Sequence, residues 1–490
     1  MYLSRDAAFL LITSSLTGTL AWGPTSTSIF LKSSLTSASA SSNQLFMTSS
    51  STESPPKKTT NSNIVLRPSS DDPNAFDSLK IGNPRVHRYT RDSSVAKTEA
   101  EYVMWYHARS ATFDEESDNS VPPLSTGRIG RAFSQNGLHW EKSTTEPLGA
   151  SLAEDMDGVS LGLNKDSWWS FDTAHVGLGQ VLLPMSNPAV ITEGGVYSMY
   201  YMGGDLSETD IVDYMDSEKA PESMKDKKIK GMTMKIGIAL SQDGRAWGRI
   251  EGDDPTGAIM VPYDKSDPSQ QLNNDDSSAS VWNVEEELYC AWPEVYVNLN
   301  AKRKEQAFTM YYSTMTKEGK EKAIARAVSE DGFRWFKRGV CLRPGINEGE
   351  DEDSDYDPKL DAAGVARCNA FKNLEFDKIE GQWEVLPKKN SKWTMYYEGV
   401  SSEDNKHRIL YAESDDGFTW NKKGILFDVG VGEEAWDCNG VGTPHILRMD
   451  DGSIRMYYTG VGKDGSTAIG VAKTNDDGVF EREQAEFTFV

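Results

Sequence analysis

Met310-Tyr311-Tyr312, followed by Ile324-Ala325-Arg326-Ala327 and the turn Asp331-Gly332, is the stretch that decides the fold, because variants of it recur along the whole chain. The aromatic triplet returns as Met104-Trp105-Tyr106, Met199-Tyr200-Tyr201, Met395-Tyr396-Tyr397 and Met456-Tyr457-Tyr458. Apolar residues at consecutive positions predict a strand that is buried on both faces. Each triplet is therefore expected to lie in a sheet that packs between two neighbouring sheets.

A second strand and a hairpin turn follow each triplet. The five turns are Asn136-Gly137, Asp243-Gly244, Asp331-Gly332, Asp416-Gly417 and Asp477-Gly478. Asn-Gly and Asp-Gly between strands favour the tight turn with positive φ at both central residues, which matches the twist of the flanking strands. A tryptophan three residues after the glycine is expected to pack on the outer strand of each copy except the fifth, which lacks it.

An acid opens each repeat, seven residues before a Pro, Gly or Cys. The pairs are Asp77 and Pro84, Asp172 and Gly179, Glu286 and Pro293, Asp361 and Cys368, and Asp437 and Pro444. All-strand repeats with a period of roughly 60 to 110 residues indicate a propeller and not a sandwich. The prediction is an all-β, five-bladed β-propeller over 63–490, with blades at about 77–150, 172–255, 286–345, 361–427 and 437–490. The acidic insert 348–357 is expected to be a solvated loop.

Composition excludes several classes of partner. The net charge of -24 argues against nucleic acid, whose phosphates need clustered Lys and Arg, and against an anionic membrane surface. No apolar run is long enough to span a membrane. The four cysteines (Cys290, Cys341, Cys368, Cys438) have no metal-ligand spacing and are expected to be reduced, mostly buried thiols. No metal and no cofactor are predicted.

The first 62 residues are expected to be a disordered presequence outside the fold. Arg5, the apolar run Ala7–Ile12 and the small residue Ala21 form a signal-peptide pattern. The stretch 22–63 is rich in Ser and Thr and poor in acids, which is typical of transit peptides. With Trp22 directly after the expected cleavage site, the segment resembles the bipartite presequence of complex plastids and predicts a plastid location. The alternative is secretion followed by a Ser-rich linker.

The repeated unit resembles that of the five-bladed glycoside hydrolases, the arabinanase, levansucrase and invertase superfamily that includes families 43 and 32, from about Asp77 to Val490. The resemblance implies a site at the funnel mouth on the propeller axis, lined by the inner strands. Three carboxylates would act there as nucleophile or base, as general acid and as an orienting group. Glycoside hydrolysis requires such a carboxyl pair, because one group protonates the leaving oxygen while the other supplies or activates the nucleophile.

Residues that differ between blades are the better functional candidates, since the repeat itself does not require them. On this basis Glu294 is the expected general acid, with Asp172 or Asp77 as nucleophile or base. The five opening acids are expected to form a ring around the funnel. They can equally serve the repeat by accepting backbone N–H bonds at a strand entrance.

The expected substrate-binding residues are Trp292, Arg85, Arg367, His175, His445, Asp361 and Asp437. Trp292 would either stack on a sugar or pack in the core. Arg85 and Arg367 would either pair with the ring acids or bind an anionic substrate such as a sugar phosphate or uronate. The two histidines are candidates for binding or for satisfied buried residues. The expected partner is a carbohydrate or a sugar phosphate.

Three functions remain open. The first is a glycosidase that uses paired carboxylates in the funnel. The second is a non-catalytic sugar-binding or scaffold propeller, because Asn83 stands before Pro84 where the family commonly carries an Asp, and an amide cannot act as a base. The third is a glycoside phosphorylase in which Arg85, Arg367 or His445 would hold phosphate. Two funnel carboxylates about 5 to 9.5 Å apart with open access between them would favour the glycosidase.

Overall fold

The computed structural model is almost entirely β-strand. It describes residues 60–90, 100–111, 127–143, 158–183, 196–214, 228–267, 270, 284–298, 307–349, 356–372, 374–379, 382–387 and 392–487. Most of the presequence and of the acidic insert therefore lies outside the described residues. In the described part, no helix is long and apolar enough to cross a membrane.

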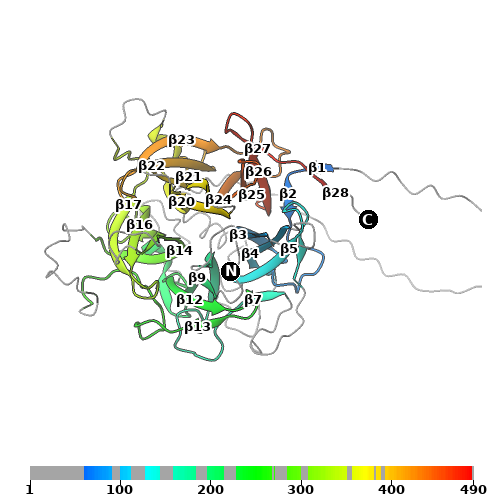
Figure 1. Cartoon of the computed structure of the whole chain (residues 1–490). Coiled ribbons are helices and arrows are strands. Elements are labelled where there is room, and N and C mark those ends of the chain that lie inside the picture. Colours follow the sequence, from blue (N-terminus) through cyan, green and yellow to red (C-terminus); the bar gives the residue numbers. More distant parts are fainter. Residues whose placement is uncertain are drawn as a thin grey trace, which may run out of the picture.

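Five antiparallel sheets surround a central axis, and the first strand of each lies innermost (Figure 1). Blade one contains β3 (Lys80–Thr90), β4 (Ala100–Arg109), β5 (Gly127–Ser134) and β6 (Glu141–Lys142), with β7 (Val159–Leu161) also paired to β5. Blade two contains β8 (His175–Leu182), β9 (Tyr197–Gly204), β12 (Lys235–Ser241) and β13 (Gly248–Ile250). Blade three contains β14 (Glu287–Val297), β15 (Phe308–Thr316), β16 (Lys322–Ser329) and β17 (Phe336–Leu342).

Blade four contains β18 (Gly364–Lys372), β21 (Trp393–Val400), β22 (His407–Ser414) and β23 (Asn421–Phe427). Blade five contains β24 (Gly440–Arg448), β25 (Ile454–Val461), β26 (Thr467–Thr474), β27 (Phe480–Arg482) and β2 (Ile64–Leu66). A single parallel bridge between His407 and Gly440 joins these last two blades. The fold is the all-β propeller that the repeats predicted.

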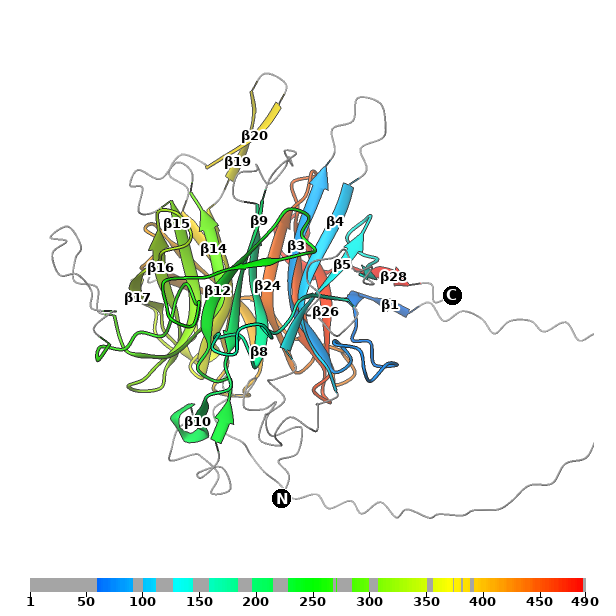
Figure 2. The ribbon, with the colours of Figure 1, turned by 90° about the horizontal axis from the view of Figure 1, so that it is seen from below.

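Two insertions leave the ring at opposite ends of the axis (Figure 2). The hairpin of β19 (Leu374–Ile379) and β20 (Gln382–Pro387) follows the inner strand of blade four. At the other end, β10 (Glu208–Asp210), the 3-10 helix η2 (Ile211–Tyr214) and β11 (Lys228–Lys230) extend from blade two. A second 3-10 helix, η6 (Pro358–Leu360), precedes blade four.

The ring is closed by the start of the fold. Strand β2 pairs with β26, and β1 (Thr60–Ser62) pairs with β28 (Ala485–Phe487). The Asn63 side chain is buried, where its Nδ2 donates to the Tyr458 hydroxyl at 2.6 Å and its Oδ1 accepts from Trp436 Nε1 at 2.8 Å. The first described strand, β1, therefore starts at Thr60, and β2 adds to the blade that contains β24 to β27.

The blades are held to one another by the aromatic strands and the hairpin turns. Tyr200, Tyr311 and Tyr457 each donate a hydroxyl hydrogen bond to the turn glycine of the next blade, at 3.0, 2.7 and 2.9 Å. Trp105 Nε1 does the same at 3.0 Å. The tryptophans after the turns pack edge-on against these clamping rings, so they belong to the blade interface and not only to the outer strand.

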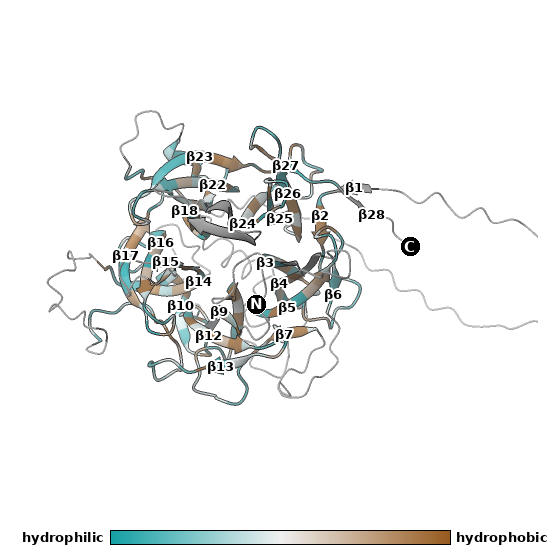
Figure 3. Ribbon diagram, in the orientation of Figure 1, coloured by the Kyte–Doolittle hydropathy of each residue, from teal (hydrophilic) through white to brown (hydrophobic). Residues whose placement is uncertain are grey.

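Hydrophobic residues accordingly lie on the strands where blades meet, and hydrophilic residues on the outer turns (Figure 3). The four cysteines are free and buried, as predicted.

Candidate functional site

Every inner strand has a register irregularity at the same level of the funnel. In four of the five strands a non-glycine residue there has positive φ: Asn83 at 49°, Trp292 at 48°, Arg367 at 37° and Thr443 at 51°. Such conformations store backbone strain, and bulges are common beside active sites because they re-aim a side chain. This level of the axis is therefore a candidate position for a functional site.

Just beyond the bulges, one polar side chain from each inner strand contributes to a closed network. We call it the axial ring; its members are Arg85, Gln180, Glu294, Asn369 and His445, and all are buried. Arg85 Nη2 lies 3.3 Å from Glu294 Oε2, while Gln180 and Asn369 donate to Glu294 Oε1 at 3.2 and 2.5 Å.

Further bonds of the axial ring run to the backbone of neighbouring blades. Arg85 Nε donates to the Gly179 carbonyl at 2.6 Å, and His445 Nε2 donates to the Val86 carbonyl at 2.9 Å. Asn369 Oδ1 accepts from the Ile446 N–H at 3.1 Å. The ring thus links all five blades across the axis.

Glu294 lies at the centre of the axial ring and is only 2% exposed. Burial raises its pKa from 4.5 to about 7, although Arg85 and Asn369 act in the opposite direction. A raised pKa suits a general acid. However, Gln180 and Asn369 both bond Oε1, and Oε2 faces Arg85 without a hydrogen bond, so the carboxyl group is enclosed by protein on every blade that it contacts.

The opening acids do not surround the funnel as expected. Four of the five are buried inside their own blades, where each accepts a hydroxyl hydrogen bond from the second residue of the aromatic pair and lies against a Lys or Arg from an outer strand. Asp77 binds Tyr106 and Lys142, Asp172 binds Tyr201 and Arg249, Asp361 binds Tyr397 and Lys422, and Asp437 binds Tyr458 and Arg482.

Blade three departs from the expected register by one residue. Its buried acid is Glu287, bound to Tyr312 and Lys337, whereas the side chain of Glu286 is 19% exposed and pairs with Lys265 at 2.6 Å. A buried acid, a tyrosine and a cation therefore recur in every blade. The structure brings neither Asp77 nor Asp172 to Glu294 as a catalytic partner.

The other expected binding residues have internal partners. Trp292 is 8% exposed and packs edge-on against Tyr289, so it offers no open platform. His175 Nε2 donates to the Gly231 carbonyl at 2.7 Å. Burial lowers the pKa of His175 to about 4 and that of His445 to about 3, so both imidazoles are neutral at pH 7.

At the bulge level the structure gathers a cationic group that we call the entrance cluster: His107, Arg109, His175 and Arg367, with the acid Glu398 and His407 beside it. Arg109 Nε donates to His107 Nε2 at 3.3 Å. Arg367 stacks on Trp292 at 4.8 Å and lies 3.4 Å from Glu398. Burial and the nearby Arg367 lower the pKa of Arg109 to about 10, and burial with Arg109, His175 and Arg367 lowers that of His107.

Four of the eleven buried side-chain atoms without a hydrogen-bond partner in the described residues lie at this level, and two more, Glu294 Oε2 and His445 Nδ1, lie in the axial ring. Among the described residues, Asn83 Oδ1, His107 Nδ1, His175 Nδ1 and Arg367 Nε accept or donate no hydrogen bond within the protein. Native structures leave few such atoms, and a ligand is one way to satisfy them.

Glu398, in contrast, is fully engaged. It accepts from His407 Nδ1 at 2.6 Å and from the Thr443 N–H at 3.0 Å. Despite burial, Arg367 and His407 lower its pKa.

His107, Arg109 and Glu398 were not among the sequence candidates. His107 and Glu398 directly follow the aromatic triplet, where the other blades have Met202, Ser313 and Thr459. The criterion of variation between blades, which selected Glu294, would also have selected these two positions. In the described ranges no group of three His, Cys, Asp or Glu residues is arranged to hold a metal ion.

Similar solved structures are glycoside hydrolases, the class that the repeat resembles. One described as a glycoside hydrolase has 17% identity over 88% of this chain and 96% of that chain, with a TM-score of 0.47. A glycosyl hydrolase from Bacteroides ovatus has 13% identity over 87% and 93%, with a TM-score of 0.46. The sucrose-6-phosphate hydrolase from Lactobacillus gasseri has 12% identity over 86% and 63%, with a TM-score of 0.46.

No protein-family model matches the chain, and no curated protein matches it in sequence. One fold hosts many unrelated functions, so the residues of the site and not the fold determine the activity.

Proposed function

We propose that the chain is a carbohydrate-binding propeller that binds an anionic sugar, a sugar phosphate or uronate, at the entrance cluster and does not hydrolyse glycosides by paired carboxylates. The observation that carries this proposal is the set of unsatisfied buried atoms on Asn83, His107, His175 and Arg367 at the bulge level. Asn83 Oδ1 can accept from a sugar hydroxyl, while Arg367 Nε can donate to an anionic oxygen.

The charge distribution supports an anionic ligand. Two arginines, Arg109 and Arg367, lie so close together that Arg367 adds to the effect of burial in lowering the pKa of Arg109, in a protein whose net charge is -24. Arginine is well suited to phosphate and carboxylate because its planar fork can donate two parallel hydrogen bonds.

The arrangement of the carboxylates argues against hydrolysis. Glu294 is enclosed by the axial ring, and Asp77 and Asp172 are bound within their blades. Asn83 occupies the place where the resemblance implies a base, and its Nδ2 donates to the Leu178 carbonyl. Among the described residues at the axis, no carboxylate pair with open access serves the two roles that hydrolysis needs.

Isothermal titration calorimetry with matched sugars tests the proposal. Glucose 6-phosphate is compared with glucose, and galacturonate with galactose. We expect one anionic member to bind at least tenfold more tightly than its neutral partner, with weaker binding in Arg367→Ala. Arg334→Ala is the control, because Arg334 is 72% exposed on a blade-three turn. Equal affinities within both pairs, or no effect of Arg367→Ala, would contradict the proposal.

Phosphorolysis is a second candidate, favoured by Asn83 together with the entrance cluster. Phosphate is itself the nucleophile, so no base is needed to activate water, and one acid suffices to protonate the leaving oxygen. Phosphate oxygen would bond to the anomeric carbon as the glycosidic C–O bond breaks. Glu294 would have to leave its partners in the axial ring to give its proton to the leaving group. Phosphate-dependent release of a sugar phosphate from an oligosaccharide panel, lost in Arg367→Ala and in Glu294→Gln, would establish this candidate.

We also propose a plastid location, supported by the composition of residues 1–59. A fluorescent protein fused after Lys58 is expected to enter the plastid, whereas its appearance in the secretory pathway would favour the alternative.

A further inference from the structure

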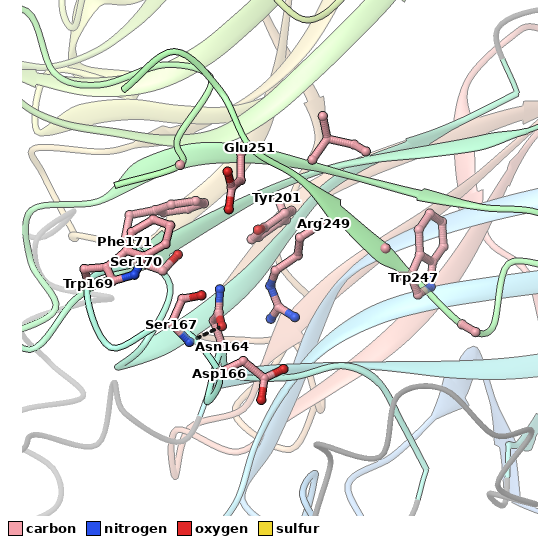
Figure 4. Close-up of a pocket in the computed structure, with 14 residues that line it drawn as sticks. Asn164, Asp166, Ser167, Trp169, Ser170, Phe171, Tyr201, Trp247, Arg249 and Glu251 are labelled. Atoms are coloured by element: carbon pink, nitrogen blue, oxygen red, sulfur yellow. Dashed lines mark hydrogen bonds between the residues drawn. The ribbon is translucent and has the colours of Figure 1, made fainter. Parts of the chain in front are cut away.

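A pocket of about 430 Å³ lies on the rim of blade two, away from the axis (Figure 4). We call it the rim pocket. One wall is the loop before β8 and the other is the segment around β13, the outermost strand of that blade. Its lining residues include Asn164, Asp166, Ser167, Trp169, Arg249 and Glu251. The volume is within the range of small-molecule sites, roughly 300 to 1,000 Å³.

The rim pocket carries an exposed aromatic surface. Trp169 lines it and is 41% exposed, and the adjacent Trp168 is 87% exposed. Phe171, Tyr201 and Trp247 contribute buried rings to the same pocket. Large aromatic residues exposed beside a cavity mark binding surfaces, and a flat ring can pack against the C–H face of a sugar.

The loop that carries Trp169 is tied to the blade at several points. Asn164 Oδ1 accepts from the Ser167 N–H at 3.1 Å, and the Ser170 hydroxyl donates to Asp172 at 2.7 Å. The Phe171 N–H donates to the Thr256 carbonyl at 3.2 Å. Binding to such a loop requires little ordering, because its conformation is already held.

The polar groups of the rim pocket suit a neutral ligand with many hydroxyls. Asp166 and Glu251 are acceptors for hydroxyl donors, and Asn164 adds an amide. Figure 4 shows Asn164, Asp166 and Arg249 facing a common space. The carboxylates of Asp166 and Glu251 disfavour an anionic ligand. The charge of Arg249 does not offset theirs, because Arg249 already pairs with Asp172 at 2.7 Å.

We propose that the rim pocket is a second carbohydrate site, which binds a neutral oligosaccharide independently of the entrance cluster. Trp169 supplies the stacking surface, and Asp166 and Glu251 accept hydrogen bonds from hydroxyls. Asp172, which was expected at the funnel, instead lies behind this pocket and fixes two of its lining residues, Ser170 and Arg249.

Calorimetry of the full chain with cellohexaose, maltoheptaose, xylohexaose and mannohexaose tests the site. We expect at least one of these probes to bind, and its affinity to fall at least tenfold in Trp169→Ala. Asp166→Ala is the second variant and is also expected to weaken binding; Asp166 is exposed, so the change leaves the core intact. Phe336→Ala is the matched control, since Phe336 is 57% exposed on the outermost strand of blade three.

The outcomes separate the two sites. Binding that is lost in Trp169→Ala but retained in Phe336→Ala and Arg367→Ala establishes the rim pocket. The proposal is overturned if none of the four probes binds, if folded Trp169→Ala and Asp166→Ala both bind normally, or if Arg367→Ala abolishes the binding. The last result would place the neutral sugar at the entrance cluster instead.

Discussion

The five blade acids and Glu294 are buried carboxyl groups with different environments. The five blade acids each have a tyrosine and a cation from the same blade. Glu294 has its partners on other blades. The blade acids stabilise single blades, and Glu294 couples the blades at the axis.

Replacing a blade acid should cost most where its cation cannot reach water. Lys422, the partner of Asp361, has a side chain only 1% exposed, whereas Lys142, the partner of Asp77, is 27% exposed. We expect Asp361→Asn to lower the free energy of unfolding by about 3 to 5 kcal/mol, because it leaves a buried charge without its partner. Asp77→Asn should cost less. Denaturant titration checks the order, and an equal or reversed order would contradict this account.

The raised pKa of Glu294 predicts that the free energy of unfolding depends on pH. The folded state retains a proton until about pH 7, whereas the unfolded chain loses it near pH 4.5. This group therefore lowers the free energy of unfolding as the pH rises from about 4.5 to 7, by the order of 3 kcal/mol at most.

Glu294→Gln should remove that contribution. Relative to the parent, the variant is expected to gain stability progressively across this pH window, in addition to a constant offset from replacing a protonated carboxyl by an amide. Urea titrations at pH 4.5, 5.5 and 7 measure the difference. Parallel stability curves for the two proteins would show that Glu294 does not titrate as described.

The sequence singled out Glu294 because the residue at its position differs between blades, but it did not predict which residues surround its carboxyl group. Its partners Gln180 and Asn369 lie far along the chain, and only the closed ring brings them together. The opening acids were located correctly in four blades but given the wrong environment, because a seven-residue offset does not say whether a side chain turns toward the axis or into the blade. In blade three the seven-residue offset selected Glu286, whereas the buried acid is its neighbour Glu287.

Among the elements, the hairpin turns act as docking points between blades. In each of the first four turns a serine hydroxyl accepts from the turn glycine N–H, and the Asn or Asp side chain accepts from the two N–H groups that follow. This leaves the glycine carbonyl facing outward for the aromatic residue of the preceding blade. The turn sequence was predictable; its role as an acceptor for another blade was not, because nothing local to the turn indicates it.

Removing one hydrogen bond between an aromatic side chain and a turn glycine of the next blade tests this role. Tyr311→Phe leaves the Gly417 carbonyl without its donor and should lower the free energy of unfolding by about 1 to 3 kcal/mol. Tyr396→Phe is the matched control, because in the described residues Tyr396 makes no such bond to the fifth turn. A change in thermal stability is expected for the first variant only, and equal losses would contradict the role of this hydrogen bond.

For the molecule as a whole, the decisive contact is the pairing of β2 with β26. Ile64, Val65 and Leu66 are 2, 3 and 5% exposed and complete the fifth blade. The repeats predicted the ring but not its closure, because the closing strand has no repeat signature and lies before the first opening acid. Only the missing tryptophan of the fifth copy marked that blade as atypical.

Deleting residues 1–66 should therefore destabilise the entire ring. Burial of each of the three side chains is worth about 1.5 to 3 kcal/mol, so the loss is of the order of 5 kcal/mol or more. Deleting residues 1–58 is the control and should leave the melting temperature unchanged. Thermal unfolding compares the two, and a peptide covering residues 60–67 is expected to restore the longer deletion. Equal melting temperatures would rule out closure by β2.

The pairing of β2 with β26 also has a consequence for how the chain folds while it is being synthesised. Ile64–Leu66 are among the first folded residues to leave the ribosome, yet their partner strand is translated almost last. Until β26 has been made, the apolar strand β2 has no partner and can associate with other polypeptides. We therefore expect chaperones to bind it during synthesis. A protease that removes the proposed targeting segment would have to cut before Thr60 in order to spare the strands that close the ring.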